Sequence, residues 1–214
     1  MTSLQVTPTA SEGSSELAGE QLGARERAGA TSHLGSAFAD SAAEKTAGCL
    51  RIRMAGPIVR DSIVDGDGLR AVVWFQGCRR KCEGCHNPES WDFNGGVEVD
   101  TDYVKEKLRT FKGQTGLTLS GGEPMWQAEA ALEIVRFAKE EMGWDVWAFS
   151  GFKFADIRDG LDGATPAMWD LARELDAIIE GEFILAERDL TLKFRGSRNQ
   201  RLLRLKGGEI VSIE

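Results

Sequence analysis

The chain has 214 residues, a formal net charge of −8 and only four cysteines. The acidic balance argues against a nucleic-acid-binding protein, because such proteins usually carry a basic bias. Three of the four cysteines lie within eight residues, whereas a secreted disulfide framework would spread them along the chain. The first residues lack the basic start and apolar core of a signal peptide, and no apolar run is long enough to cross a membrane. We therefore expect a cytoplasmic protein without nucleic-acid or membrane partners.

Residues 1–48 are rich in Ala, Gly, Ser, Thr and Glu and contain few large apolar side chains. Such a segment can bury little apolar surface to offset the conformational entropy that ordering would cost. We therefore predict that residues 1–48 form a low-complexity, disordered extension. The remaining residues, 49–214, are predicted to form one folded domain.

The predicted domain begins with strands. Residues 50–54 alternate between apolar and charged side chains, which is typical of a strand with one buried face. Residues 63–68 contain the Asp-Gly-Asp-Gly sequence of a turn. Residues 71–75, AVVWF, are a continuous apolar run, which is typical of a buried strand in a parallel sheet. This strand leads into a loop, residues 78–86, with the sequence CRRKCEGCH.

Helices and strands alternate along the rest of the chain. In chain order, we predict a helix at 99–111, a strand at 117–120, a helix at 128–142, a strand at 145–149, a helix at 166–175, a strand at 177–179 and a hairpin at 202–213. This alternation predicts βαβ units and a parallel sheet. Because these units are too few to close an eight-stranded barrel, we expect an α/β fold with a partial, open parallel β/α barrel.

Polar or glycine-rich residues follow the end of each strand in this predicted sheet. Cys78, Gly121, Ser150 and Glu180 occupy these positions. Ligands of parallel α/β folds gather at the carboxyl ends of the strands, so we expect the four residues to converge on one edge of the sheet.

Two familiar kinds of site explain the cysteine loop incompletely. The Cys-x-x-Cys-His sequence at residues 82–86 is the attachment pattern of c-type haem, but it leaves Cys78 unused and normally belongs to proteins outside the cytoplasm. Zinc could be held by the three cysteines and His86, but adjacent residues such as Cys85 and His86 seldom direct both side chains onto one ion.

A [4Fe–4S] cluster held by Cys78, Cys82 and Cys85 is the hypothesis that we favour, because thiolates favour iron–sulfur clusters. Three ligands for four irons leave one iron open to a further ligand. Cys49 precedes the first predicted strand, and we interpret it as a bystander. The open iron fits S-adenosylmethionine (SAM), whose amino and carboxylate groups can chelate it. The Cys-x3-Cys-x2-Cys spacing directly after a buried strand resembles the radical SAM superfamily.

The stretch Ser120-Gly121-Gly122-Glu123-Pro124 supports this resemblance. Two glycines allow a ligand to approach the backbone closely, although glycines after a strand are usually only a turn. Backbone carbonyls, or the carboxylate of Glu123, can hold an ammonium group. In the resembled superfamily, the corresponding stretch contacts the amino group of SAM.

Further segments resemble one family within that superfamily, the activating proteins of anaerobic (class III) ribonucleotide reductase. The matching segments are residues 77–91 around the cysteine loop, 64–70 upstream of it, Ser150-Gly151-Phe152, Gly181-Glu182-Phe183, and residues 189–201, which contain Arg195-Gly196-Ser197-Arg198-Asn199-Gln200. The resemblance covers residues 56–205. Three residues depart from the family's pattern: Asp67 replaces the usual Pro, His86 replaces the usual Tyr, and Glu180 stands where Asp is commoner.

The resemblance implies a partial barrel of the radical SAM type and an oxidoreductase that uses one [4Fe–4S] cluster and SAM. Its product would be a glycyl radical on anaerobic ribonucleotide reductase, formed when a 5′-deoxyadenosyl radical removes a hydrogen atom. The cluster and SAM carry this chemistry, so no further catalytic residue is predicted. Cys78, Cys82 and Cys85 would bind iron. Gly84 and His86 would approach the adenine, Gly121, Gly122 and Glu123 would hold the methionine end of SAM, and Cys85 would bind the cofactors through its iron.

Partners other than the reductase are also implied. Arg79, Arg80 and Lys81 lie in the cysteine loop, where an acidic flavodoxin or ferredoxin could dock to deliver an electron, although plain solubility explains them equally well. The arginines of residues 195–201 could bind the glycine loop of the reductase or form a solvated basic surface.

Two other functions remain open: a radical SAM enzyme acting on a small molecule or peptide, and a non-catalytic metal-binding module.

Overall fold

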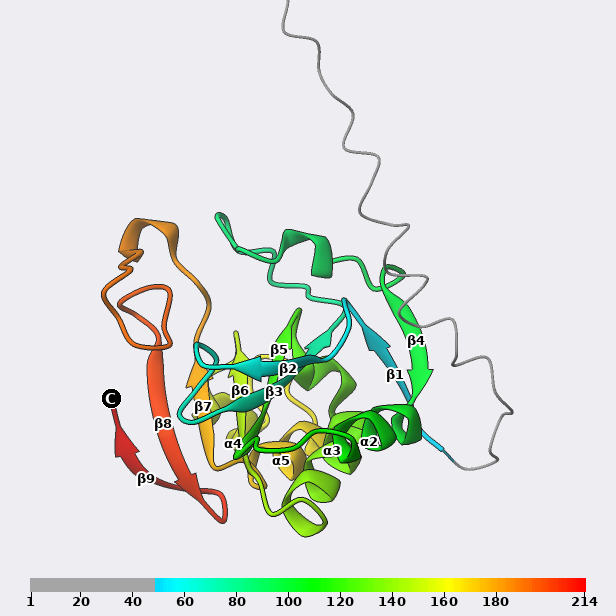
Figure 1. The fold of residues 1–214 in the computed structure, drawn as a ribbon. Coiled ribbons are helices and arrows are strands. Elements are labelled where there is room, and N and C mark those ends of the chain that lie inside the picture. Colours follow the sequence, from blue (N-terminus) through cyan, green and yellow to red (C-terminus); the bar gives the residue numbers. More distant parts are fainter. Residues whose placement is uncertain (1–48) are drawn as a thin grey trace, which may run out of the picture.

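The computed structural model describes residues 49–214, and its fold is built around one mixed β-sheet (Figure 1). The strands are β1 (Arg51–Met54), β2 (Val59–Ser62), β3 (Arg70–Phe75), β4 (Val97–Asp100), β5 (Gly116–Gly121), β6 (Asp145–Ser150), β7 (Ala177–Glu180), β8 (Arg201–Lys206) and β9 (Glu209–Ile213). The α-helices are α2 (Thr101–Arg109), α3 (Ala128–Glu140), α4 (Phe154–Asp159) and α5 (Pro166–Ala172). Short 3-10 helices occupy Pro88–Ser90, Pro124–Gln127 and Leu185–Glu187.

The centre of the sheet is parallel, as the alternation of helices and strands predicted. The strand order is β4-β1-β3-β5-β6-β7-β8-β9, and β2 pairs with β3. β3, β5, β6 and β7 are mutually parallel, whereas the other strands pair antiparallel. The α/β class is therefore confirmed, and the sheet is large and open.

The two faces of the sheet are covered differently. Alternate residues of β3, such as Ala71, Val73 and Phe75, are fully buried in the main core, to which α3 contributes Ile134 and Val135. The helices labelled in Figure 1 lie along this face. The opposite face carries a smaller cluster of Trp147, Ala177, Ile179 and Leu202, against which Phe149 and Phe194 pack.

Several predicted boundaries were wrong because short edge strands give weak sequence signals. The helix predicted at 99–111 begins at Thr101, because Val99 lies in β4 and pairs with Ile52. The four residues of β4 alternate between valine and acidic side chains, which is a strand pattern. β2 was missed because its sequence, VRDS, is mostly polar and exposed. The short helix α4 was also missed.

The predicted disordered extension, residues 1–48, lies outside the described residues, so it stays a prediction. Among the residues that the structure describes, no helix combines the length and apolar character that a membrane span requires.

Candidate functional site

The predicted convergence of strand ends is present in the sheet. Phe75 at the end of β3 pairs with Gly121 at the end of β5. Ser150 at the end of β6 pairs with Glu180 at the end of β7. Because parallel strands end at the same edge, the cysteine loop after β3 and the polar ends of three further strands share one side of the molecule.

The cysteine loop is anchored at its base by backbone and side-chain hydrogen bonds. The backbone N–H of Gly77 donates to the carbonyl of Ser90 at 2.7 Å, and that of Cys78 donates to Trp91 at 3.1 Å. The buried side-chain amide of Gln76 donates to the carbonyls of Glu89 and Asp92. Gln76 was missed as a supporting residue, although a polar residue directly after an apolar strand was a signal of this role.

The three thiols of the loop are free and only partly exposed. Burial raises the pKa of the thiols of Cys78 and Cys82, so a bound cation is needed to hold them as thiolates near neutral pH. In a tetrahedral zinc site, bonds of about 2.3 Å bring the sulfurs to about 3.8 Å from one another. Within residues 49–214, the loop thiols do not form a group of three ligands within 4.8 Å of one another, so they are not gathered as closely as one zinc ion would require.

Cys49 contacts helix α2 and not the cysteine loop. Its sulfur lies 3.1 Å from the hydroxyl of Thr101. Cys49, Asp102 and Glu133 do bring their ligand atoms within 4.8 Å of one another. However, Lys105 forms ion pairs with both carboxylates, so part of their charge is already compensated.

The two glycines at the carboxyl end of β5, Gly121 and Gly122, lie directly against the base of the cysteine loop. The N–H of Gly122 donates to Phe75, and the N–H of Glu123 donates to Gly77. A Cβ at Gly122 would lie 2.6 Å from the carbonyl oxygen of Gly77, and one at Gly121, where φ is +99°, would lie 2.5 Å from that of Phe75. Glycine is therefore required at both positions so that the end of β5 can pass close to the backbone of Phe75 and Gly77. This steric role is additional to any role towards a ligand.

The carboxylate of Glu123 faces β6. It is 1% exposed, and it accepts hydrogen bonds from the Ser150 hydroxyl at 2.9 Å and from the N–H groups of Gly151 and Met125 at 2.7 and 3.1 Å. Burial raises its pKa to about 7. Both carboxylate oxygens are thus engaged, which leaves backbone carbonyls, such as that of Gly121, as the better acceptors for a ligand ammonium.

Gly84 and His86 occupy different environments. A Cβ at Gly84 would lie 2.9 Å from Leu185 and 3.3 Å from Phe183, so this part of the loop packs on the segment after β7. His86 is exposed and lines a cavity of about 630 Å³. The other lining residues are Ile63, Val64, Asp65, Phe149, Phe183, Leu192, Lys193, Phe194, Arg195, Gly196 and Gln200.

The segment before β8 wraps around the end of β7. The amide of Gln200 donates to the carbonyl of Gly181, and its oxygen accepts from the N–H groups of Gly196 and Ser197. Asn199 donates to the carbonyl of Glu182. The side-chain amides of Asn199 and Gln200 therefore have a structural role that the sequence did not reveal.

The three arginines of the segment before β8 differ in their partners and in their exposure to solvent. Arg201 forms an ion pair with the buried carboxylate of Glu180. Arg195 donates to the carbonyl of Gln200, whereas the side chain of Arg198 is 59% exposed. Of these three, Arg198 is the one most accessible to a partner.

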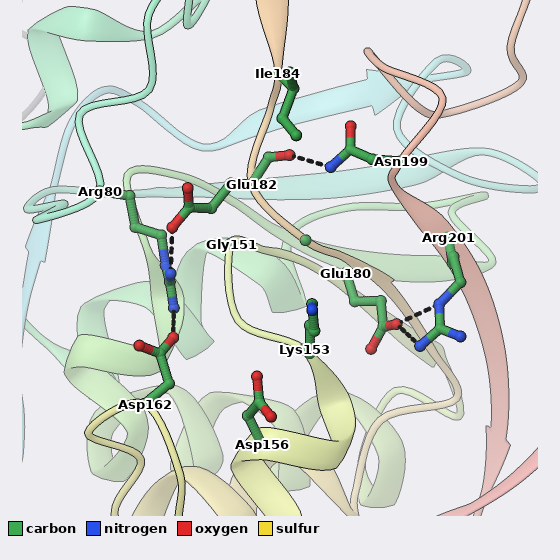
Figure 2. A pocket seen from close by; sticks show the side chains of 11 residues that line it. Arg80, Gly151, Lys153, Asp156, Asp162, Glu180, Glu182, Ile184, Asn199 and Arg201 are labelled. Carbon is green, nitrogen blue, oxygen red and sulfur yellow. Dashed lines mark hydrogen bonds and ion pairs between the residues drawn. The ribbon is translucent and has the colours of Figure 1, made fainter. Parts of the chain in front are cut away.

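A second, strongly charged cavity of about 650 Å³ lies beside the cysteine loop, at the carboxyl ends of β6 and β7 (Figure 2). It carries both signs of charge. The lining cations are Arg80, Lys153 and Arg201, and the lining anions are Asp156, Asp162, Glu180 and Glu182. Such a cavity suits a ligand group that itself carries both signs.

Comparisons with known proteins agree with this site. A family model described as a 4Fe-4S single cluster domain matches residues 64–203, a range that includes both the cysteine loop and the glycine pair. The anaerobic ribonucleoside-triphosphate reductase-activating protein of Haemophilus influenzae is 34% identical over 151 residues, which are 67% of this chain and 93% of that protein. The protein of the same name from Enterobacteria phage T4 is 34% identical over 146 residues, 65% of this chain and 86% of that protein. The pyruvate formate-lyase-activating enzyme of Clostridium pasteurianum is 42% identical over 84 residues, 37% of this chain and 35% of that enzyme.

Proposed function

Since this chain belongs to the family of anaerobic ribonucleoside-triphosphate reductase-activating proteins, we propose that it generates a glycyl radical on an anaerobic ribonucleotide reductase. It is a radical SAM oxidoreductase that uses a [4Fe–4S] cluster and SAM. The observation that carries the proposal is the placement of three free thiols on one loop whose base lies against a glycine pair at the carboxyl edge of a parallel sheet.

The proposed roles follow from the donor groups present. Cys78, Cys82 and Cys85 hold the irons. The backbone of Gly121 and Gly122 binds the methionine end of SAM, and Glu123 orients that backbone by tying it to β6. When bound, the cluster and SAM supply one-electron cleavage chemistry and a hydrogen-abstracting 5′-deoxyadenosyl radical.

We assign different binding roles to the cavity lined by His86 and to the charged cavity of Figure 2. We assign the adenine end of SAM and the glycine segment of the reductase to the cavity lined by His86, where exposed Ile63 and Val64 offer apolar contact to a peptide. The charged cavity of Figure 2 is not lined by Gly121 or Gly122, so we assign it to charged groups of the reductase segment and not to SAM. Residues 49–214 are the proposed activase domain, and the parallel strands β3, β5, β6 and β7 the proposed partial barrel of the radical SAM type. Free thiols are maintained in a reducing compartment, in keeping with a cytoplasmic site of action.

The decisive experiment starts from anaerobic protein reconstituted with iron and sulfide. Addition of dithionite and SAM is expected to release 5′-deoxyadenosine, and further addition of the candidate reductase is expected to give a doublet glycyl signal in electron paramagnetic resonance. Pyruvate formate-lyase is the matched control substrate. Protein that binds metal but releases no 5′-deoxyadenosine would be a binding module. Release of 5′-deoxyadenosine without a glycyl signal on the reductase would indicate another substrate.

We propose that a flavodoxin or ferredoxin delivers the electron at the groove beside Cys78. This groove is lined by Arg79 and Lys81 together with Trp91 and Phe93. Arg80 is not among the lining residues, because its side chain is 15% exposed and pairs with two carboxylates. The proposed docking surface therefore includes Arg79 and Lys81, but not Arg80, which the sequence had also suggested.

Charge reversal tests this docking surface. The variant carrying Arg79→Glu and Lys81→Glu is expected to be reduced about tenfold more slowly by flavodoxin at low salt, because steering of an acidic donor is lost. Reduction by dithionite is the control, and it is expected to be unchanged. Equal flavodoxin rates in wild type and variant at low ionic strength would contradict the proposed surface.

A further inference from the structure

Arg80 lies between the first two cysteines of the loop, yet its side chain is turned into the molecule. It is 15% exposed, and it lines the charged cavity of Figure 2. Its neighbour Arg79 is exposed, with its guanidinium over the rings of Phe93 and Trp126. The two arginines therefore have different environments although they are adjacent in the chain.

Two carboxylates from separate segments meet the guanidinium of Arg80. One terminal nitrogen donates to Glu182, which follows β7, and the other donates to Asp162, in the loop between α4 and α5. Figure 2 shows the guanidinium between the two acids, with one ion pair on either side. Charge-assisted bonds of this kind are shorter and stronger than neutral ones.

The residues after β6 complete the binding site for this arginine. The guanidinium lies 4.3 Å from the ring centroid of Phe152, a favourable cation–π distance. A Cβ at Gly151 would lie 2.7 Å from Cδ of Arg80, so the glycine makes room for the arginine stem. Gly151 thus leaves space for the arginine stem, and the ring of Phe152 offers a cation–π contact to its guanidinium.

We propose that Arg80 is a positioning residue that clamps the thiol loop to the ends of β6 and β7, with Glu182 and Asp162 as its anchors. Arg80 adds an ionic attachment between Cys78 and Cys82 to the loop's base on β5 and to the packing of Gly84 on the segment after β7. Because the loop must hold three thiolates while the cluster changes charge, this ionic attachment slows loop opening and loss of iron. This inference rests on the proposed function only in assuming that the loop carries a cluster.

The test compares Arg80→Met with Arg79→Met, which removes the same charge from the same loop. Each reconstituted protein is held without oxygen with an iron chelator, and loss of the cluster's visible absorption is followed. Arg80→Met is expected to lose iron about tenfold faster than wild type, the factor that loss of charge-assisted hydrogen bonds supports. Arg79→Met is expected to stay within about twofold of wild type, and Arg80→Lys, which keeps the charge, to fall between the two methionine variants. Equal rates in Arg80→Met and Arg79→Met would overturn the clamp.

Amide hydrogen exchange of the loop provides a readout that needs no cluster. In protein without iron, residues 78–86 are expected to exchange about tenfold faster in Arg80→Met than in Arg79→Met, while the strands of the core exchange equally in both. If the wild-type protein takes up no cluster, the proposed function fails. The comparison of loop exchange rates in the two variants still tests whether Arg80 holds the loop. Unchanged loop exchange in Arg80→Met would refute it.

The anchors give a second, independent variant set should Arg80→Met fold poorly. Glu182→Gln and Asp162→Asn are each expected to accelerate loop exchange, and their double variant is expected to approach Arg80→Met, because it removes both ion pairs of Arg80. Full additivity of the Glu182 and Arg80 variants would show that the two side chains act independently and would contradict the proposal.

Discussion

Glu123 is a carboxylic acid whose environment disfavours its charged form. Its two oxygens accept three hydrogen bonds from Ser150, Gly151 and Met125, yet burial dominates and raises its pKa to about 7 from an ordinary value of 4.5. The acid links the end of β5 to the end of β6, so its protonation bears on the geometry of the glycine pair beside it.

The sign of the resulting pH dependence follows from proton linkage. Between pH 4.5 and about 7, the folded protein holds more protons on Glu123 than the unfolded chain does. The free energy of unfolding is therefore expected to fall by about 3 kcal/mol as pH rises through this range. Chemical denaturation of wild type and Glu123→Gln at several pH values measures the difference, because the glutamine variant lacks this contribution. Parallel pH profiles of the two proteins would show that the carboxyl titrates normally.

Gly122 and Gly56 provide a matched pair of glycine substitutions. A Cβ at Gly122 would lie 2.6 Å from the carbonyl oxygen of Gly77, whereas one at Gly56 would have nothing within 4 Å. Gly122→Ala is expected to lower the free energy of unfolding by about 2–3 kcal/mol and to impair cluster uptake, because backbone must move. Gly56→Ala is expected to change it by less than about 0.5 kcal/mol. Thermal denaturation measures the change in stability of each variant, and iron content after reconstitution measures its cluster uptake. Equal effects of Gly122→Ala and Gly56→Ala would contradict the close passage of Gly122 past the carbonyl of Gly77.

At the scale of elements, a buried arginine joins the amino ends of three parallel strands. Arg70 at the start of β3 is fully buried, and its guanidinium donates to the Thr118 hydroxyl, the Leu117 carbonyl and the carboxylate of Asp145. It also lies 5.0 Å from the ring centroid of Trp147 in β6. The sheet therefore has a polar junction at one end and the ligand-binding edge at the other. Pattern reasoning predicted the strands but not this junction, since a charged first residue looks like the boundary of a strand.

Loss of this arginine is expected to be costly. Arg70→Leu would leave several buried acceptors without a donor and is expected to lower the free energy of unfolding by about 3–5 kcal/mol. Arg60→Leu is the control, because the Arg60 side chain is 55% exposed and pairs with the exposed Asp61; its effect should stay within about 0.5 kcal/mol. Denaturant titration of both variants distinguishes these values, and a similar small effect for both would rule out a stabilising junction.

At the scale of the whole molecule, Asp67 joins the loop before β3 to the C-terminal part of the chain. Its carboxylate accepts from Lys193 at 2.9 Å and from Arg204 of β8 at 2.6 Å. These two bonds lower the pKa of Asp67, so its contribution to stability is present above about pH 4 and lost as the acid is protonated below it. Where the resembled family usually has proline, which would stiffen the turn, Asp67 instead forms ionic contacts with Lys193 and Arg204.

The Asp67 network is partly exposed, and its contribution should depend on salt. Asp67→Asn is expected to lower the free energy of unfolding by about 0.5–1 kcal/mol at low ionic strength and by much less in 1 M salt, because mobile ions screen exposed pairs. Denaturation of both proteins at the two salt concentrations tests this. A difference that is equally large in high salt would mean that Asp67 acts through local backbone geometry.

The sequence by itself determined the parallel sheet and the three-thiol loop, because both depend on spacing along a short stretch of chain. Alternating helices and strands imply βαβ units, and three cysteines within eight residues need no tertiary contact to be recognised. Only the tertiary structure decided which side chains support the loop. Arg80 meets Glu182 across 102 residues, and Glu123 meets Ser150 across 27. Neither pairing leaves a local signal, because a charged residue looks the same in sequence whether it faces solvent or a partner that folding brings to it.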